Sequence, residues 1–239
     1  MTLAGIDVSA AGQGGAFPWA DWKGKIAFAG VKISEGTGFA DPDAARNIEQ
    51  ARAIGVAVIG YHFLHASLSG SGQAEHFLSC AEAAGLGEPG DLFALDAEDA
   101  GLDGEPYVQM NLTASAFTGE IRRHPRYVSY WPLAYTEISM APSLVSLANC
   151  PLWLADLTDP KMTRVGPWSL VSIWQTGQRG VDADVFNGDA AQLAALGILG
   201  ARGVGSRDGR RGRPRHAARP AADVAHPAQP AGLRAQGLP

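Results

Sequence analysis

The sequence predicts an α/β fold, an irregular (β/α) barrel of the TIM type that forms a single domain. Short apolar segments alternate with helix candidates over most of the 239 residues. Several of these segments are continuously apolar, as expected for parallel strands that are buried on both faces. Acidic and aromatic residues recur where the segments end, and the carboxyl ends of barrel strands are where active sites form.

Seven segments predict strands. They share runs of β-branched, aromatic or other apolar residues, and they comprise residues 3–8, 26–33, 56–63, 91–95, 127–135, 152–155 and 170–174. From about residue 150 onward the helical signal weakens, so the last strands are expected to follow one another through short loops.

Helix signals lie between the strands. Asp41 is expected as an N-cap with Pro42 at the first helical position, and Gly55 can end that helix in the left-handed conformation. Two further helices are expected at residues 73–84 and at about 106–123. This strand–helix alternation favours the barrel over an all-β or all-α fold.

Composition divides the chain near residue 200. Residues 1–200 carry 11 Lys and Arg against 22 Asp and Glu, whereas residues 201–239 carry 8 Arg against 2 Asp. The tail is rich in Arg, Ala, Pro and Gly, and it cannot bury enough apolar surface to offset its chain entropy. We expect a folded domain over residues 1–199 and a basic, disordered tail over residues 200–239.

Charge and motifs argue against several function classes. The acidic body does not favour nucleic-acid binding. Cys80 and Cys150 form no Cys-x-x-Cys pair, so free thiols are favoured over a zinc or redox site, and no metal or cofactor is expected. No phosphate loop, dinucleotide fingerprint or nucleophile elbow occurs. The chain as given shows neither a signal peptide nor an apolar run long enough for membrane insertion.

The most informative segment is DLFALDAED at residues 91–99. Apolar residues lead into Asp96 and Glu98, and residues i and i+2 of a strand share a face. Two carboxylates this close cannot both ionise cheaply, so we expect at least one raised pKa. A protonated carboxyl group beside an ionised one is what cleavage of a glycosidic bond needs. On this short motif alone, a solvated acidic loop weighs slightly more.

Other strand ends carry residues of the same kinds. Candidate site residues are Asp7 at the end of the first strand, Glu35 after the second, Tyr61 and His62 in the third, Trp153 in the sixth and Asp156 after it, Gln175 after the seventh and Asp182 beyond it. Taken singly, Asp7 could cap a turn and His62 could be a satisfied core residue. Their recurrence at so many strand ends is what favours a shared site.

Two pairs leave alternatives open. Lys32 and Glu35 could form an ion pair at the surface instead of lining a site. Asp182 and Asp184 are again spaced i and i+2, so one could face the site while the other caps a turn.

Five motifs occur in order: GIDVS, VKISEGTGFADP, GYHF, LDAED and WQTGQRGVDADVF. Together they resemble the family-25 glycoside hydrolases, the lysozymes of phage endolysins and secreted bacterial muramidases. The resemblance covers about residues 3–196 and leaves out the tail. It implies a barrel of five β/α units followed by irregular strands. It also implies hydrolysis of the β-1,4 bond between N-acetylmuramic acid and N-acetylglucosamine in peptidoglycan.

The resemblance implies roles for individual residues. Glu98 matches the general acid, and Asp96 matches the acid beside it, which either orients the substrate's N-acetyl group or acts on water. Asp7 and Asp182 match acids on the floor of the site. Residues implied at the sugar groove are Glu35, Tyr61, Trp153 and Gln175, with His62 in a supporting role and Asp156 beside them.

The expected partner is a peptidoglycan glycan strand, bound by a monomer at the bacterial cell wall. The protein would reach the wall by phage-type release from the host cytoplasm or by secretion. One rival is a wall-binding module without catalysis, and another is a chitinase-like barrel glycosidase. The four acids argue against the first rival, and the GIDVS and EGTG segments against the second. Tyr130 and Tyr135 lie in a stretch that departs from the family pattern, so neither is assigned a role.

Overall fold

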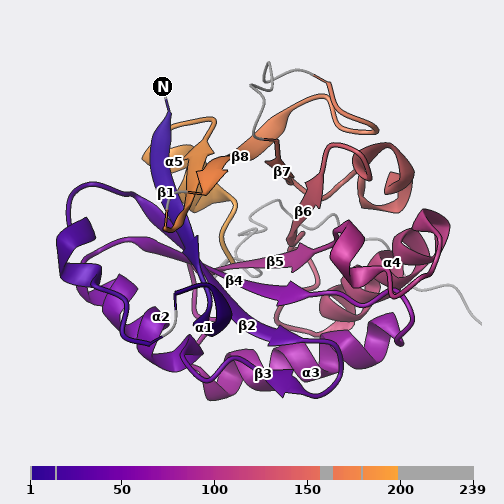
Figure 1. Ribbon diagram of the computed structural model, residues 1–239, viewed down its shortest axis with the longest axis horizontal. Coiled ribbons are helices and arrows are strands. Elements are labelled where there is room, and N and C mark those ends of the chain that lie inside the picture. The colour runs from indigo at the N-terminus through magenta and orange to yellow at the C-terminus, as the bar shows by residue number, and fades with distance from the viewer. Residues whose placement is uncertain (1, 14, 157–163, 179, 199–239) are drawn as a thin grey trace, which may run out of the picture. The chain divides into compact units, whose positions relative to one another are not determined.

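The strands close into a barrel at the centre of the fold (Figure 1). The computed structural model describes residues 2–13, 15–156, 164–178 and 180–198. The expected tail over residues 200–239, and its boundary with the domain, lie outside the described residues. The irregular (β/α) barrel that the sequence predicts is confirmed in the described part of the chain.

The strands are β1 (Leu3–Val8), β2 (Phe28–Glu35), β3 (Phe39–Ala40), β4 (Ala57–Phe63), β5 (Leu92–Asp96), β6 (Leu133–Glu137), β7 (Leu152–Ala155), β8 (Val171–Gln178) and β9 (Asp182–Phe186). Their order is β1-β9-β8-β7-β6-β5-β4-β2, and β1 pairs with β2 to close the barrel. Neighbouring strands are parallel except at β9, which is antiparallel to both β8 and β1. The short β3 forms a hairpin on the end of β2.

Most of the predicted strands agree with the observed ones. The segments at residues 3–8 and 152–155 match β1 and β7 to the residue. The segment at residues 127–135 is largely wrong, because β6 begins only at Leu133 and the preceding Tyr127 and Tyr130 pack their rings on Phe93. The sequence also predicts no strand at β9, whose acidic residues interrupt the apolar pattern.

The helices are α1 (Ala10–Gln13), α2 (Ala44–Ala53), α3 (Gly70–Ala83), α4 (Tyr107–Arg123) and α5 (Ala190–Ala195), with short 3₁₀ turns η1 (Trp19–Trp22), η2 (Asp99–Gly101), η3 (Ala141–Ser143) and η4 (Val145–Leu147). The long helices α2, α3 and α4 lie on the side of β2, β4 and β5 (Figure 1). Short helical turns replace a full helix after β1 and β6. No helix of the described residues is long and apolar enough to cross a membrane.

Helix α2 starts later than the sequence predicts. Its N-cap is Asp43, whereas the Asp41 carboxylate accepts hydrogen bonds of 2.9 Å from the backbone N–H groups of Asp43 and Ala10. Asp41 therefore ties the turn before the helix to the segment that follows β1. Gly55 and Gly85 have φ angles of 85° and 76° directly after α2 and α3, as expected for residues that end helices.

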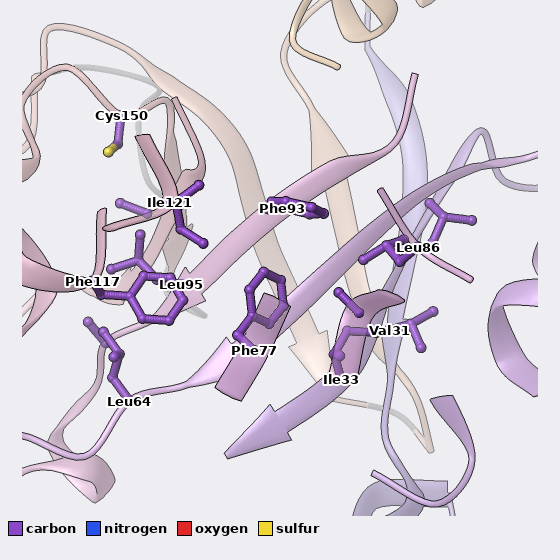
Figure 2. Packing of buried hydrophobic residues seen from close by; sticks show 14 of the residues in the cluster. Val31, Ile33, Leu64, Phe77, Leu86, Phe93, Leu95, Phe117, Ile121 and Cys150 are labelled. Carbon is purple, nitrogen blue, oxygen red and sulfur yellow. The ribbon is translucent and has the colours of Figure 1, made fainter. Parts of the chain in front are cut away.

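Apolar side chains fill both faces of the barrel wall. Outside the wall, Phe77 of α3 and Phe117 of α4 pack with Phe93 of β5 in the layer between strands and helices (Figure 2). The Phe77 and Phe93 ring centroids are 5.1 Å apart. The interior cluster comprises Phe28, Ile59, Leu92, Ala94, Leu133, Trp153, Ile173, Phe186 and Leu193. Leu193 belongs to α5, so this helix covers the amino ends of the strands and leaves the carboxyl ends open to polar side chains.

Gly30 of β2 makes room for the largest interior side chain. A Cβ at Gly30 would lie 2.7 Å from the Trp153 ring and 2.7 Å from Asp7 Cβ, well inside van der Waals contact. Any side chain there would displace one of them. The indole of Trp153 can therefore lie across the barrel directly beneath the polar end.

The two cysteines are unbonded, as the sequence favours. Cys150 is buried and Cys80 is half-buried.

Candidate active site

A cavity of about 220 Å³ opens at the carboxyl ends of the parallel strands. Each of the barrel strands β1, β2 and β4–β9 contributes to it directly or through the residues that follow. The lining residues are Asp7, Lys32, Tyr61, Phe63, Asp96, Glu98, Tyr135, Trp153, Gln175 and Asp182. Carboxylates and aromatic rings therefore share one small space, at the end of the barrel where the sequence predicts chemistry.

Asp96 and Glu98 enter this cavity side by side. Asp96 is the last residue of β5, and Glu98 keeps an extended backbone with φ −137° and ψ 169°. Ala97 between them is fully buried on the opposite face. The expected common face of the pair is therefore present, because the strand geometry continues beyond the last ladder hydrogen bond.

Both carboxyl groups have a pKa above the ordinary value. Burial, with a further contribution from the Glu137 carboxylate, raises the pKa of Glu98 to about 6. Burial and then the charge of Glu98 raise the pKa of Asp96 well above its ordinary value. The buried Oδ1 of Asp96 has no hydrogen-bond partner among the described residues. The pair can therefore hold a proton near neutral pH, as general acid catalysis requires.

A chain of hydrogen bonds holds Asp7 on the floor of the cavity. The Tyr135 hydroxyl donates to Gln175 Oε1 at 3.0 Å, and Gln175 Nε2 donates to Asp7 Oδ2 at 2.9 Å. Burial and then the charge of Asp182 raise the pKa of Asp7 to about 7. Because Gln175 is itself buried, this chain fixes the orientation of Asp7 relative to the strands around it.

The two acids of β9 have different surroundings. Asp182 lines the cavity, and partial burial raises its pKa. Asp184 lies deeper, with 2% of its surface exposed, and its Oδ1 accepts a hydrogen bond of 2.8 Å from Trp153 Nε1. Neither acid caps a turn, because both side chains face into the barrel.

Glu35 lies at the rim and not among the lining residues of the cavity. Its two oxygens accept hydrogen bonds from Lys32 Nζ at 2.7 Å and from His65 Nε2 at 2.9 Å. The Lys32–Glu35 pair exists, but Lys32 is largely buried and its ammonium lies 4.9 Å from the centre of the Phe63 ring. Lys32 therefore belongs to the wall of the cavity, and Glu35 holds it from the rim, so the pair is not a fully solvated surface ion pair.

The structure separates His62 and Asp156 from the cavity. His62 is fully buried on the outer face of β4, where it stacks on Phe117 and its Nδ1 is 2.8 Å from Ser34 Oγ. This placement corrects the expectation that His62 contacts substrate, since neighbours on a strand face opposite sides and Tyr61 takes the inner one. Asp156 is buried after β7 and is not a lining residue.

The candidate site residues leave out four residues of this region. Lys32, Phe63 and Tyr135 line the cavity, and Asp184 lies beneath it; the sequence left Lys32 and Asp184 as open alternatives and gave Tyr135 no role. Phe63 lies two residues after Tyr61 on the same strand, so the alternation of strand faces would have placed both side chains on the inner face. Tyr135 received no role because the sequence predicts the start of β6 too early. Asp184 depends on the pairing of β9 with β1, which no local pattern indicates.

A second groove, of about 410 Å³, lies near the amino ends of β6 and β7. Its lining includes Arg126, Tyr130 and Trp131 but no acidic residue. The arrangement offers no acid–base pair, so the smaller cavity is the better candidate for chemistry. In the part of the chain that the structure describes, no group of three or more His, Cys, Asp or Glu residues is arranged to hold a metal ion.

Comparisons with known proteins agree with this geometry. The model of the family described as "Glycosyl hydrolases family 25" matches residues 6–185. An N,O-diacetylmuramidase of Arthroderma benhamiae is 28% identical over an alignment of 188 residues that covers 73% of this chain and 78% of the relative.

Solved structures give the same result. The lysozyme from Streptomyces coelicolor superposes with a TM-score of 0.67 at 27% identity, covering 81% of this chain and 96% of that one. A family GH25 lysozyme from Aspergillus fumigatus superposes with a TM-score of 0.66 at 27% identity, covering 84% of this chain and all of that one. The resemblance that the sequence motifs predict is thus confirmed, and the chain belongs to glycosyl hydrolase family 25.

Proposed function

We propose that this family-25 glycosyl hydrolase is a lysozyme. It cleaves the β-1,4 bond between N-acetylmuramic acid and N-acetylglucosamine in peptidoglycan, with Glu98 as general acid and Asp96 assisting attack at the anomeric carbon. The observation that carries the proposal is a carboxyl pair with raised pKa values in a cavity at the carboxyl ends of barrel strands. The muramidase and lysozymes to which the chain is similar support the choice of substrate.

Glu98 is suited to protonate the leaving oxygen. It is the more exposed of the pair and lies at the mouth of the site, whereas Asp96 is 8% exposed. A carboxyl group with a pKa near 6 keeps its proton in mildly acidic solution and can still release it during the reaction. Asp96 lies deeper in the cavity.

In their ionised forms, Asp7 and Asp182 supply negative potential in the cavity, and Asp7 gains this form as pH rises toward 7. Glycosidic cleavage passes through an oxocarbenium-like transition state, which carries positive charge at the anomeric carbon. Fixed carboxylates in the cavity stabilise the charge as it develops, and the hydrogen bond from Gln175 fixes Asp7 in place before substrate arrives. Both acids therefore act on the transition state without taking part in proton transfer.

Aromatic side chains give the cavity an affinity for sugar rings. Tyr61, Tyr135 and Trp153 line its wall, and the Tyr135 and Trp153 rings meet edge to face at a centroid distance of 5.5 Å. Rigid aromatic faces favour the apolar faces of pyranose rings, and Gln175 adds a polar group among them. Glu35 contributes at the rim by holding Lys32 against the cavity.

The enzyme is expected to act as a monomer. The place of action is the bacterial cell wall, reached by phage-type release from the host cytoplasm or by secretion. Light scattering at working concentration should give the mass of a single chain.

The proposal is tested by lysis of purified peptidoglycan, followed by turbidity. The intact chain and Asp99→Asn, which changes an exposed carboxyl group beside Glu98, should both clear the suspension. Glu98→Gln should lose about 10²–10⁴-fold in rate, the contribution typical of general acid catalysis. Chitin digested in parallel should release no product. Clearing by Glu98→Gln at the normal rate would refute the assignment, and chitin as the better substrate would indicate a different barrel glycosidase.

A further inference from the structure

A buried carboxyl pair lies beneath the residues proposed for catalysis. Strands β1 and β9 are antiparallel, with Gly5 opposite Asp184 and Asp7 opposite Asp182. Asp184 is therefore the diagonal cross-strand neighbour of Asp7 in this ladder, and each carboxyl group affects the pKa of the other. They are 8% and 2% exposed, so bulk water solvates neither fully.

Hydrogen-bond donors of the protein satisfy only some of the carboxyl oxygens of Asp7 and Asp184. Gln175 Nε2 donates to Asp7 Oδ2 at 2.9 Å, and Trp153 Nε1 donates to Asp184 Oδ1 at 2.8 Å. The buried Oδ2 of Asp184 receives no hydrogen bond from any described group. Two ionised carboxylates offer each other acceptors only, so a hydrogen bond between them requires one proton.

The proton belongs on the more deeply buried member of the pair, because a charge there has the larger desolvation cost. Burial and then the charge of Asp7 raise the pKa of Asp184 well above its ordinary value, in agreement with the geometry. Lys32 is the one basic side chain among the described residues that line the cavity. It faces several carboxyl groups, so an additional charge on Asp184 would be poorly compensated.

We propose that Asp184 is a positioning residue that remains protonated and donates a hydrogen bond from Oδ2 to Asp7. The proposal rests on the proposed function, since Asp7 acts on substrate only if the cavity is the glycosidase site. In this role Trp153 orients Asp184, and Asp184 orients Asp7 and stabilises its carboxylate. No bond to substrate involves Asp184 itself.

A matched pair of variants separates hydrogen bonding from packing. Asp184→Asn keeps the size of the side chain, an acceptor for Trp153 and an N–H donor toward Asp7. Asp184→Leu has a similar volume and neither group. If the donor matters, the kcat of Asp184→Asn on peptidoglycan fragments should stay within about threefold, whereas that of Asp184→Leu should fall about 10- to 100-fold, the loss expected for one hydrogen bond to a charged group.

Two further measurements are the separate effects on kcat and KM and the pH profile of kcat/KM. Asp184→Leu should change kcat with little change in KM, and loss of its donor should raise the pKa of Asp7 and move the acidic limb of kcat/KM to higher pH. Asp184→Asn should keep the wild-type acidic limb. Equal kcat and equal profiles for the two variants would overturn the positioning role while wild-type activity stands. An inactive wild-type chain would instead refute the proposed function.

A spectroscopic measurement covers the case in which Asp184→Leu fails to fold. The ¹³C resonance of the Asp184 carboxyl carbon, identified by its absence in Asp184→Asn, should show the chemical shift of a neutral carboxylic acid at pH 6. The shift of an ionised carboxylate at that pH would overturn the proposal.

Discussion

Glu98 owes its proton to its surroundings and not to its residue type. Burial raises its pKa most, the Glu137 carboxylate adds to the shift, and Lys32 opposes it. Asp96 is affected in the same direction by burial and by Glu98 itself, so the pair titrates as a coupled unit. We therefore expect an enzyme whose activity depends on the protonation of Asp96 and Glu98 near neutral pH.

The first prediction concerns the alkaline limb of activity. As pH rises through the pKa of Glu98, about 6, the general acid loses its proton and kcat/KM should fall. Glu137→Gln removes a nearby negative charge, so the pKa of Glu98 should drop and the limb should move to lower pH. A pH series of kcat/KM on soluble fragments measures both effects. Glu88→Gln, at an exposed carboxyl group outside the cavity lining, serves as the control. An unmoved limb in Glu137→Gln would contradict this origin of the shift.

At the scale of elements, β2 shapes the site from below. Gly30 lies opposite Asp7 in the β1–β2 ladder, and its missing side chain leaves space for the Trp153 ring. Trp153 in turn donates a hydrogen bond to Asp184. A side chain at Gly30 that displaced the Trp153 ring would therefore also disturb the carboxyl groups. The antiparallel β9 completes this arrangement by bringing its two acids beside β1.

Gly30→Ala should therefore destabilise the fold by about 1–3 kcal/mol, as overpacking in a filled core does. It should also lower kcat, because Trp153 or Asp7 must move to admit the methyl group. Gly119 of α4 is the matched control, since a Cβ there meets nothing within 4 Å. Gly119→Ala should be neutral or stabilising by about 0.5–1 kcal/mol. Urea unfolding of both variants decides the point, and equal stabilities would show that the interior adapts to a side chain at Gly30.

At the scale of the whole molecule, the buried acids lower stability at neutral pH. The folded-state pKa of Asp7 is raised from 3.8 to about 7, so the folded state binds more protons than the unfolded state between those values. The stability linked to this group is complete below about pH 4 and is lost as pH rises toward 7. The carboxyl groups of the site therefore lower the free energy of unfolding near neutral pH, where catalysis needs both protonated and ionised carboxyl groups.

Asp7→Asn removes this linkage and should raise Tm at pH 8, on the order of 5 °C, with little difference at pH 4. Calorimetry of the variant and the wild type across that range measures the trend. Asp21→Asn, at an exposed carboxyl group, should leave Tm unchanged at both values. A Tm difference for Asp7→Asn that shrinks with rising pH would have the wrong sign for a raised pKa.

The sequence predicts the parts of the site that depend on local spacing. Asp96 and Glu98 lie two residues apart at a strand end, so their common face follows from strand geometry. The prediction that His62 contacts substrate is wrong, because the adjacent residues Tyr61 and His62 cannot both face inward. Only closure of the barrel decides which of the two does. The position of Asp184 near Asp7 could not be predicted, because it depends on the pairing of two strands that lie far apart in the sequence. Long-range pairing, which leaves no local pattern, accounts for what the sequence could not predict.

Analysis of the reducing ends released from purified peptidoglycan tests the central claim most directly. Digests by the intact chain and by Glu98→Gln are reduced with borohydride, and the new ends are identified by mass spectrometry. The intact chain should produce reduced N-acetylmuramic acid ends, and Glu98→Gln should produce almost none. New ends made of N-acetylglucosamine, or N-acetylmuramic acid ends released equally by Glu98→Gln, would contradict cleavage of this bond by Glu98.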